Sequence, residues 1–432
     1  MKIAQLTPGS GDNFYCENCL RDAALVRAMR LLDIEVLMIP MYLPLQTDKD
    51  TKTSNAPIFF GGINVYLQQK LSLFRKTPRW LDKLFDRPRF LEWVGKMAGM
   101  TSAKDLGETT ISMLRGEQGR QEKELARLIA WLRQPENKPD VVCLSNALLA
   151  GLAKRIKERL NVPVVCLLQD EDGFLDGLAE PYSKQAWDVL ARRVQDIDLF
   201  IAVSRYYAGV MQKRLKLSTD RVHVVYTGIP LEGYEERKSG PKIPTIGFLS
   251  RMSPDKGLDT LIEAFITLKQ SKGLENIRLI AAGGKTSNDE AFLGRIKQRL
   301  KASGFIGDVE FRSGFERNER LDFFREITVL SVPEKRPVAY GLYVLEALAG
   351  GVPFVEPDIG VFSELLEMTG GGVLYEPGGP KVLADQLKPF LLDAEYALEL
   401  GARGKRGVKE NFDIKQTAEN MMRIYEQVTR RT

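Results

Sequence analysis

The segment Pro333–Glu364, with the sequence PEKRPVAYGLYVLEALAGGVPFVEPDIGVFSE, decides the fold class of this chain. A helical run at Tyr343–Ala349 ends at the pair Gly350-Gly351, and the apolar run Val352–Glu356 is typical of a short buried strand. A polar loop, a helix and a buried strand in this order indicate an α/β domain built on a parallel sheet.

The start of this helix carries a candidate nucleotide site. Gly341 and Leu342 form the turn before the helix, and the N–H groups of a first helical turn readily bind phosphate. Glu346 follows one turn later, where a carboxylate suits the two hydroxyls of a ribose. A solvated glutamate on the helix surface is the alternative interpretation.

Length and composition limit the class of protein. A chain of 432 residues is too long for one core, so two or three domains are expected. Hydrophobic residues make up 44% and charged residues 28%, as in soluble globular proteins. There is no run of about 18 apolar residues, and the amino-terminal MKIAQLTPGSGD does not resemble a signal peptide. The net charge of +5 is too small to indicate a nucleic-acid partner.

The cysteines and the single histidine disfavour several chemistries. Cys16 and Cys19 form one CxxC pair without a second, so two partly buried thiols are favoured over a redox or zinc pair. Cys143 and Cys166 lie in apolar, strand-like runs, and we expect a reducing, cytoplasmic location. His223 lies in an alternating strand pattern, which disfavours histidine-based catalysis and metal binding.

The chain shows two successive alternations of strands and helices. The first begins with a strand at Lys2–Leu6, the loop Gly9-Ser10-Gly11 and a helix at Cys19–Leu32, which is typical of a doubly wound α/β domain. The loop lacks the full GxGxxG fingerprint, so dinucleotide binding is weakly supported. A polar linker at 231–242 precedes the second alternation, which starts at Thr245.

Residues 44–135 interrupt the first alternation. A glycine turn there ends at Asn64, a candidate acceptor or sugar contact. The part at 68–98 is rich in aromatic and basic residues. Its basic residues are Lys70, Arg75, Lys76, Arg79, Lys83, Arg87, Arg89 and Lys96. Such a segment suits contact with an anionic membrane surface. We favour a helical insertion that packs its aromatic side chains on its own domain.

Acidic residues follow the strand at Val162–Leu168. Asp170, Glu171 and Asp172 match the DxD pattern, but the metal-binding architecture that uses this pattern does not fit the alternation seen here. We expect these acids at the carboxyl end of a parallel strand, where ligands of open α/β sheets bind. There they would meet sugar hydroxyls or cap the helix that follows.

The loop Ser250–Gly257 is a candidate anion site. Arg251 and Lys256 lie between a predicted strand and the next helix N-terminus, and an Arg fork with a Lys charge suits two phosphates. A solvated basic loop is the alternative. Together with Glu346 from another strand end of the same sheet, the two cations predict a site for a diphosphate and its ribose.

Two stretches, GFLSRMSPDKGLDTLIEAF and YGLYVLEALAGGVPFVEPDIGVFSELLE, make the chain similar to the carboxyl half of retaining glycosyltransferase family 4. The resemblance extends through AVSRYYAGVMQKRL and VVYTGI into the first half. It implies an α/β GT-B fold of two facing Rossmann-like domains with a cleft between them. The domains would be 1–235, with a helical insertion at about 44–135, and 236–413, with the last helix, 414–432, packing back on the first.

The resemblance also implies a function and its residues. The protein would transfer a sugar from a nucleotide-diphosphate sugar to an acceptor hydroxyl, with retention and without a metal or another cofactor. Arg251 and Lys256 would hold the diphosphate, Glu346 the ribose, and the loop from Gly9 to Asp12 would lie near the sugar. The acceptor is an unspecified glycan, lipid or small molecule.

The chain departs from the family pattern at one position near the sugar. Val338 stands where the Glu-x(7)-Glu motif has its first glutamate, and the loss of one transition-state group typically costs about a hundred- to a thousand-fold in rate. Glu334, four residues before Val338, is a candidate to replace the missing glutamate, but it does not stand at the motif position. The histidine that many members carry in the first domain is also absent, and Asn146 and Asp170 occupy comparable strand ends. A catalytically silent nucleotide-sugar-binding protein is therefore the second hypothesis, ahead of an epimerase.

Overall fold

The computed structural model describes residues 1–8, 17–41, 59–60, 103–286, 289–314 and 316–430. The predictions made for Gly9-Ser10-Gly11, for Asn64, for Cys16 and for 68–98 lie outside these residues. The chain divides into two compact units. Unit 1 comprises Met1–Gly11, Asn18–Val225 and Ala418–Thr432, and unit 2 is built mainly on Tyr226–Thr417.

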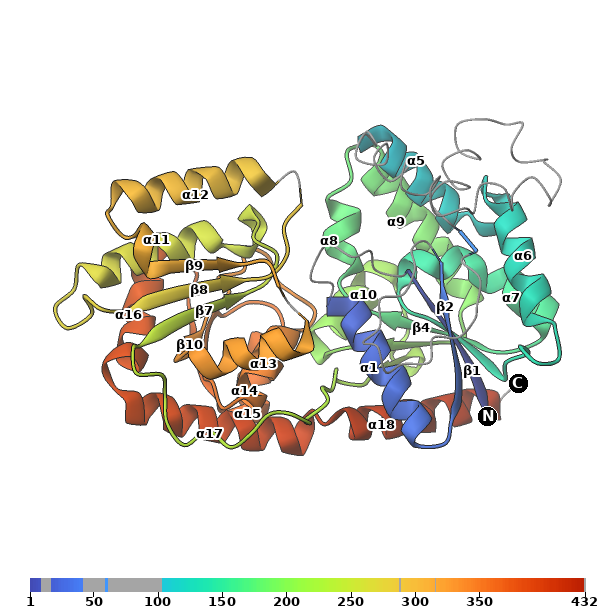
Figure 1. Ribbon diagram of the computed structural model, residues 1–432. Helices are drawn as coiled ribbons and strands as arrows, with labels where there is room; N and C mark the ends of the chain where they lie inside the picture. Colours follow the sequence, from blue (N-terminus) through green and yellow to red (C-terminus); the bar gives the residue numbers. More distant parts are fainter. Residues whose placement is uncertain (9–16, 42–58, 61–102, 287–288, 315, 431–432) are drawn as a thin grey trace, which may run out of the picture. The chain divides into compact units, whose positions relative to one another are not determined.

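Unit 1 is a parallel sheet of six strands flanked by helices (Figure 1). The strand order is β2-β1-β3-β4-β5-β6, and its strands are β1 (Lys2–Thr7), β2 (Glu35–Pro40), β3 (Val141–Leu144), β4 (Val164–Leu168), β5 (Leu199–Ala202) and β6 (Val222–Val224). The central strands β3 and β4 are buried along their whole length, because helices cover both faces of a parallel sheet. Cys143 and Cys166 lie in these two strands and His223 lies in β6, as predicted.

The helices of unit 1 follow the strands in the predicted alternation. They are α1 (Glu17–Leu31), α5 (Ala103–Leu114), α6 (Glu122–Leu132), α7 (Ala153–Leu160), α8 (Glu171–Asp176), α9 (Tyr182–Arg193) and α10 (Arg205–Leu215). A helical insertion was predicted at about 44–135, but neither α5 within it nor α9 was located from the sequence. Helix α5 packs on α9 so closely that an added Cβ at Gly107 would overlap the ring of Tyr182.

Unit 2 is a second parallel sheet with a different strand order, β12-β11-β10-β7-β8-β9. Its strands are β7 (Thr245–Leu249), β8 (Arg278–Ala282), β9 (Val309–Arg312), β10 (Val329–Leu330), β11 (Phe354–Pro357) and β12 (Gly372–Tyr375). Counted within the unit, this is the doubly wound order 3-2-1-4-5-6, in which the winding direction reverses between β7 and β10. The carboxyl ends of these two strands therefore mark the expected ligand edge.

The helices of unit 2 cover both faces of its sheet. They are α11 (Leu258–Lys269), α12 (Glu290–Ala302), α13 (Arg317–Glu326), α14 (Leu342–Ala349), α15 (Phe362–Thr369), α16 (Pro380–Leu392) and α17 (Ala394–Asn411). Figure 1 shows α11 and α12 on one side of the sheet and α13 and α14 on the other. The segment Pro333–Glu364 thus forms the loop after β10, then α14, β11 and the first residues of α15.

The last helix, α18 (Ile414–Thr429), belongs to unit 1 from Ala418 onward. Its Tyr425 is fully buried beside the thiol of Cys143 in β3, and burial raises the pKa of both groups. The chain therefore returns to the sheet on which it began. Among the described helices, none has both the length and the hydropathy that a membrane span requires.

Candidate functional site

The loop after β7 and the loop after β10 touch at the ligand edge of unit 2. Pro254–Lys256 forms a short 3-10 turn that ends at Gly257, whose φ of +69° lies in the left-handed region. A Cβ at Gly257 would overlap the carbonyl oxygen of Pro333, so glycine is required for this close approach. The contact places Lys256 beside the first residues after β10.

Arg251 is held within its own loop. Its guanidinium donates to Asp255 Oδ1 at 3.1 Å, and its Nε lies 3.8 Å from Asp289 Oδ2. Burial opposes the ionisation of Asp255, but the Ser253 hydroxyl, Arg251 and Lys256 outweigh it and lower the pKa of that carboxyl group. The Arg251 side chain is 41% exposed, so a ligand can reach the guanidinium.

Lys256 connects the two loops to helix α14. Its Nζ donates to Glu334 Oε1 at 2.8 Å, and the hydroxyl of Tyr343 donates to the same oxygen at 3.2 Å. Glu334 follows β10 and is buried, whereas Tyr343 belongs to the first turn of α14. Each predicted diphosphate cation thus already has a carboxylate partner, which a bound diphosphate would have to compete with.

Glu346 is buried, so the interpretation as a solvated surface glutamate is wrong. Arg320 of α13 donates its Nε to both carboxyl oxygens at 3.1 Å each, and its Nη2 lies 3.1 Å from Oε1. Arg320 was not predicted from the sequence. Its spacing to Phe323 and Phe324 on the buried face of α13 is the signal that could have found it.

A cavity of about 300 Å³ lies at the same edge of the sheet, next to Arg320. It is lined by Leu249, Ala282 and Arg312, the register-paired last residues of β7, β8 and β9. Arg320 and Phe323 of α13 complete part of the wall. Arg320, the partner of Glu346, thus lines a hollow at the ligand edge of the sheet.

Gly341 and Val338 lie just before α14. Gly341, which has no side chain of its own, is the N-cap residue of the helix where the sequence predicts the approach of a phosphate to Gly341 and Leu342. Val338 is 8% exposed, and its carbonyl accepts a hydrogen bond from the Val361 N–H at 3.1 Å. The position of the missing glutamate is therefore filled by a packed apolar side chain.

Glu356 in β11 is a buried acid. From the sequence it was predicted only as the end of the buried strand Val352–Glu356. It is 0% exposed, and its Oε1 accepts from the Val332 N–H at 2.8 Å. Within the described residues, Oε2 has no hydrogen-bond partner. Burial raises the pKa of Glu356 well above its usual range, and the charge of Glu334 adds to this effect.

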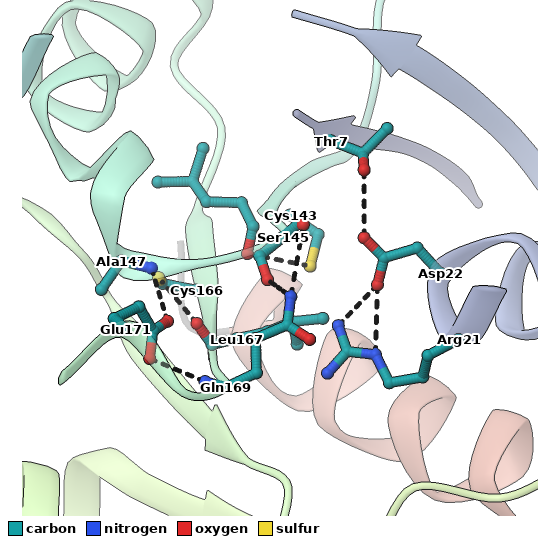
Figure 2. Close-up of polar contacts among 11 residues, drawn as sticks. Thr7, Arg21, Asp22, Cys143, Ser145, Ala147, Cys166, Leu167, Gln169 and Glu171 are labelled. Atoms are coloured by element: carbon teal, nitrogen blue, oxygen red, sulfur yellow. Dashed lines mark hydrogen bonds and ion pairs between the residues drawn. The ribbon is translucent and has the colours of Figure 1, made fainter. Parts of the chain in front are cut away.

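In unit 1, the three predicted acids follow β4 but differ in their surroundings. Glu171 is buried, and it accepts from the N–H groups of Ala147 and Gln169 at 2.8 Å (Figure 2) and from the Tyr207 hydroxyl at 2.7 Å. The Glu171 carboxylate thus binds groups in the interior of unit 1, which contradicts its predicted contact with a sugar hydroxyl. Asp170, with a φ of +67°, and Asp172 remain partly exposed.

Other buried polar side chains lie at the carboxyl ends of β1 and β3. Figure 2 shows Asp22 between two partners: Thr7 Oγ1 donates to it at 3.1 Å, and Arg21 Nη2 at 2.5 Å. Asn146 Oδ1 caps the helical turn after β3 by accepting from the Leu148 N–H at 3.1 Å. The Thr7–Asp22 bond ties β1 to α1, a tie that the sequence analysis did not identify.

The architecture of the chain is similar to that of solved structures of other proteins. Sucrose-phosphate synthase from Thermosynechococcus elongatus has a TM-score of 0.72 at 15% identity, with 100% of both chains covered. Anabaena HepE in complex with UDP has a TM-score of 0.68 at 16% identity, covering 99% of this chain and 100% of HepE. Two parallel α/β units with these likenesses define a protein of the GT-B fold, as expected.

The family models match adjacent parts of the chain. The model described as "Glycosyltransferase Family 4" matches 111–232, and the one described as "Glycosyl transferases group 1" matches 235–407. The chain belongs to these glycosyltransferase families, and the resemblance read from the sequence is confirmed.

A curated relative is also similar over part of its length. The lipopolysaccharide core biosynthesis mannosyltransferase LpsB of Rhizobium meliloti is 29% identical over 208 residues, which are 46% of this chain and 57% of LpsB. The chain thus spans little more than half of this relative's length.

Proposed function

We propose that this protein transfers a sugar from a nucleoside-diphosphate sugar to an acceptor hydroxyl, with retention and without a metal. The observation that carries the proposal is the meeting of the β7 loop, the β10 loop and α14 at the switch point of unit 2, through Lys256, Glu334 and Tyr343. This is the edge at which open α/β sheets bind ligands. The UDP complex of the structurally similar HepE supports a nucleotide donor.

The proposed mechanism assigns charge stabilisation to unit 2. Arg251 and Lys256 stabilise the diphosphate as the bond between its oxygen and the anomeric carbon breaks, and Glu346 holds the ribose. The acceptor oxygen then bonds to the anomeric carbon from the same face, and its proton passes to the departing phosphate oxygen. Preorganised cations and backbone dipoles supply the stabilisation, so the step requires no protein nucleophile.

A second candidate function is nucleotide-sugar binding without turnover. It is favoured by Val338, an apolar and packed side chain where the family has a glutamate near the donor sugar. Binding would survive this change better than catalysis, because the diphosphate and ribose contacts come from other residues.

The two candidates are separated by nucleotide release from UDP-, ADP- and GDP-sugars. We expect the natural chain to turn over at least one donor, and Val338→Glu to change its rate. Val338→Gln is the matched control for side-chain length without charge, and thermal unfolding of both variants checks their packing. If both the natural chain and Val338→Glu bind nucleotide and neither releases it, the silent function replaces transfer.

The acceptor and the location belong to the same proposal. We place the protein in carbohydrate biosynthesis in the cytoplasm, with a glycan, lipid or small-molecule acceptor. A lipid-borne acceptor would bring the basic segment 68–98 to the inner membrane face. Co-sedimentation with anionic vesicles tests this contact, and the absence of salt-sensitive binding would dismiss it.

A further inference from the structure

The ion pair between Arg320 and Glu346 is buried inside unit 2. The Arg320 side chain is 8% exposed and the Glu346 side chain 5% exposed. Removing two charges from water is costly, and well-packed apolar residues often stabilise a core as well as a buried pair does. Stability alone therefore gives a weak reason for an ion pair at this place.

The geometry holds the Glu346 carboxylate in one orientation. Arg320 Nε is shared equally between the two carboxyl oxygens at 3.1 Å, and Nη2 adds a contact of 3.1 Å to Oε1. The planar guanidinium therefore fixes the plane of the carboxylate as well as its position. Tyr234, from the linker, lies beside the same carboxylate, which helps burial to raise the pKa of the phenol.

Helix α13 is itself anchored, so Arg320 is a firm support. A capping box of Glu316 and Glu319 begins the helix. At its other end, Arg237 donates to the carbonyls of Phe324 at 2.8 Å and Ile327 at 2.6 Å. These contacts tie the linker to the helix that carries Arg320.

The pair leaves Glu346 with capacity to bind a ligand. A carboxylate offers about four lone-pair sites, and the contacts with Arg320 and Tyr234 do not use all of them. The cavity that Arg320 lines opens on the same edge of the sheet. A carboxylate that is already oriented can accept two vicinal hydroxyls without rearranging, which is the advantage of a preorganised site.

We propose that Arg320 is a positioning residue for the ribose of the donor: it orients the Glu346 carboxylate so that each oxygen accepts one of the 2′ and 3′ hydroxyls. This inference rests on the proposed function. It assigns to Arg320 a role in ligand selection, and not only in holding α13 against α14.

The test is discrimination between ribose and deoxyribose nucleotides. UDP, ADP and GDP are titrated into the natural chain by calorimetry, and the tightest is compared with its 2′-deoxy and 3′-deoxy analogues. We expect each analogue to bind about tenfold or more weakly, because a hydrogen bond to a charged acceptor is lost. In Arg320→Met the ratio should fall to about one to three, with little change in affinity for the deoxy analogues.

Two further variants separate positioning from packing. Arg325→Met changes an exposed arginine of the same helix, which pairs with Asp322 at 2.8 Å, and should leave the ratio unchanged. Arg320→Lys keeps a charge but not the planar fork, so the ratio should fall here too, and this variant serves if Arg320→Met does not fold.

The outcomes distinguish the inference from the function on which it rests. If the natural chain discriminates and the folded Arg320 variants discriminate equally well, the positioning role is overturned while the proposed function stands. If no nucleoside diphosphate binds, or if the natural chain does not discriminate, the role of Glu346 in ribose binding fails, and the inference fails with it.

Discussion

At the residue scale, the acids of unit 2 have two different tasks. Glu334 neutralises Lys256 at 2.8 Å, whereas Glu356 is buried, with one oxygen on the Val332 N–H. Glu334 therefore acts through its contact with a cation, whereas burial raises the pKa of Glu356. We therefore expect a change at Glu334 to alter anion binding and a change at Glu356 to alter stability.

The first prediction concerns Glu334→Gln. The amide keeps an acceptor for Lys256 but removes a negative charge next to the proposed diphosphate. We expect nucleoside diphosphates to bind about five- to thirtyfold more tightly at low salt, roughly 1–2 kcal/mol, with a smaller gain as salt is added. Asp259→Asn, which loses an exposed ion pair with Lys335, is the control for titration calorimetry. Weaker binding by Glu334→Gln would contradict the placement of the diphosphate at Lys256.

The second prediction concerns Glu356 and pH. Since burial raises the folded-state pKa above the ordinary value of 4.5, the folded protein keeps a proton that the unfolded chain releases. This contribution to stability is complete below about pH 4.5 and is lost as pH rises toward the folded pKa, by up to about 1.4 kcal/mol per pH unit.

Glu356→Gln should remove this loss, so its stability advantage over the natural chain should grow from pH 5 to pH 8. Urea unfolding across that range measures it. Glu376→Gln, which changes an exposed glutamate beyond β12, is the control. Parallel stability curves for the natural chain and Glu356→Gln would show that Glu356 does not hold its proton.

At the element scale, the strands were the most predictable part of the fold. Buried parallel strands are continuous apolar runs, so β4, for example, lies within the predicted Val162–Leu168. Helix α5 was missed because Gly107 and the pair Thr109-Thr110 weaken its helical signal, and its packing on α9 is what supports it. Local pattern thus located the elements that bury themselves, but not one that depends on a distant partner.

The third prediction concerns the docking of α18 through Tyr425. This side chain is 0% exposed, and its hydroxyl lies beside the Cys143 thiol, a weak hydrogen-bonding group. Tyr425→Ala should cost about 3–5 kcal/mol through the cavity it leaves. Tyr425→Phe should be close to neutral, because it loses only this weak contact. Thermal unfolding distinguishes the two, and a Phe variant as unstable as the Ala variant would show that the hydroxyl matters.

At the scale of the whole molecule, the chain forms two parallel sheets with different strand orders. The cations Arg251 and Lys256 could be chosen from the sequence because a loop between a strand and a helix is a local pattern. Their acid partners could be chosen only in part: Asp255 is four residues from Arg251, but Glu334 is 78 residues from Lys256. Arg320 could have been found from its spacing on α13, but its pairing with Glu346 could not, since the two residues are 26 positions apart and lie on different helices.

We propose that Arg251, Lys256 and Glu346 of unit 2 bind a nucleoside diphosphate. Titration of UDP, ADP and GDP into the natural chain, Arg251→Ala and Lys256→Ala tests this binding. We expect at least one nucleotide to bind the natural chain, and each variant to weaken binding about tenfold or more through the loss of a charge-assisted contact. Unchanged affinity in both folded variants, or no binding of any of the three nucleotides, would contradict it.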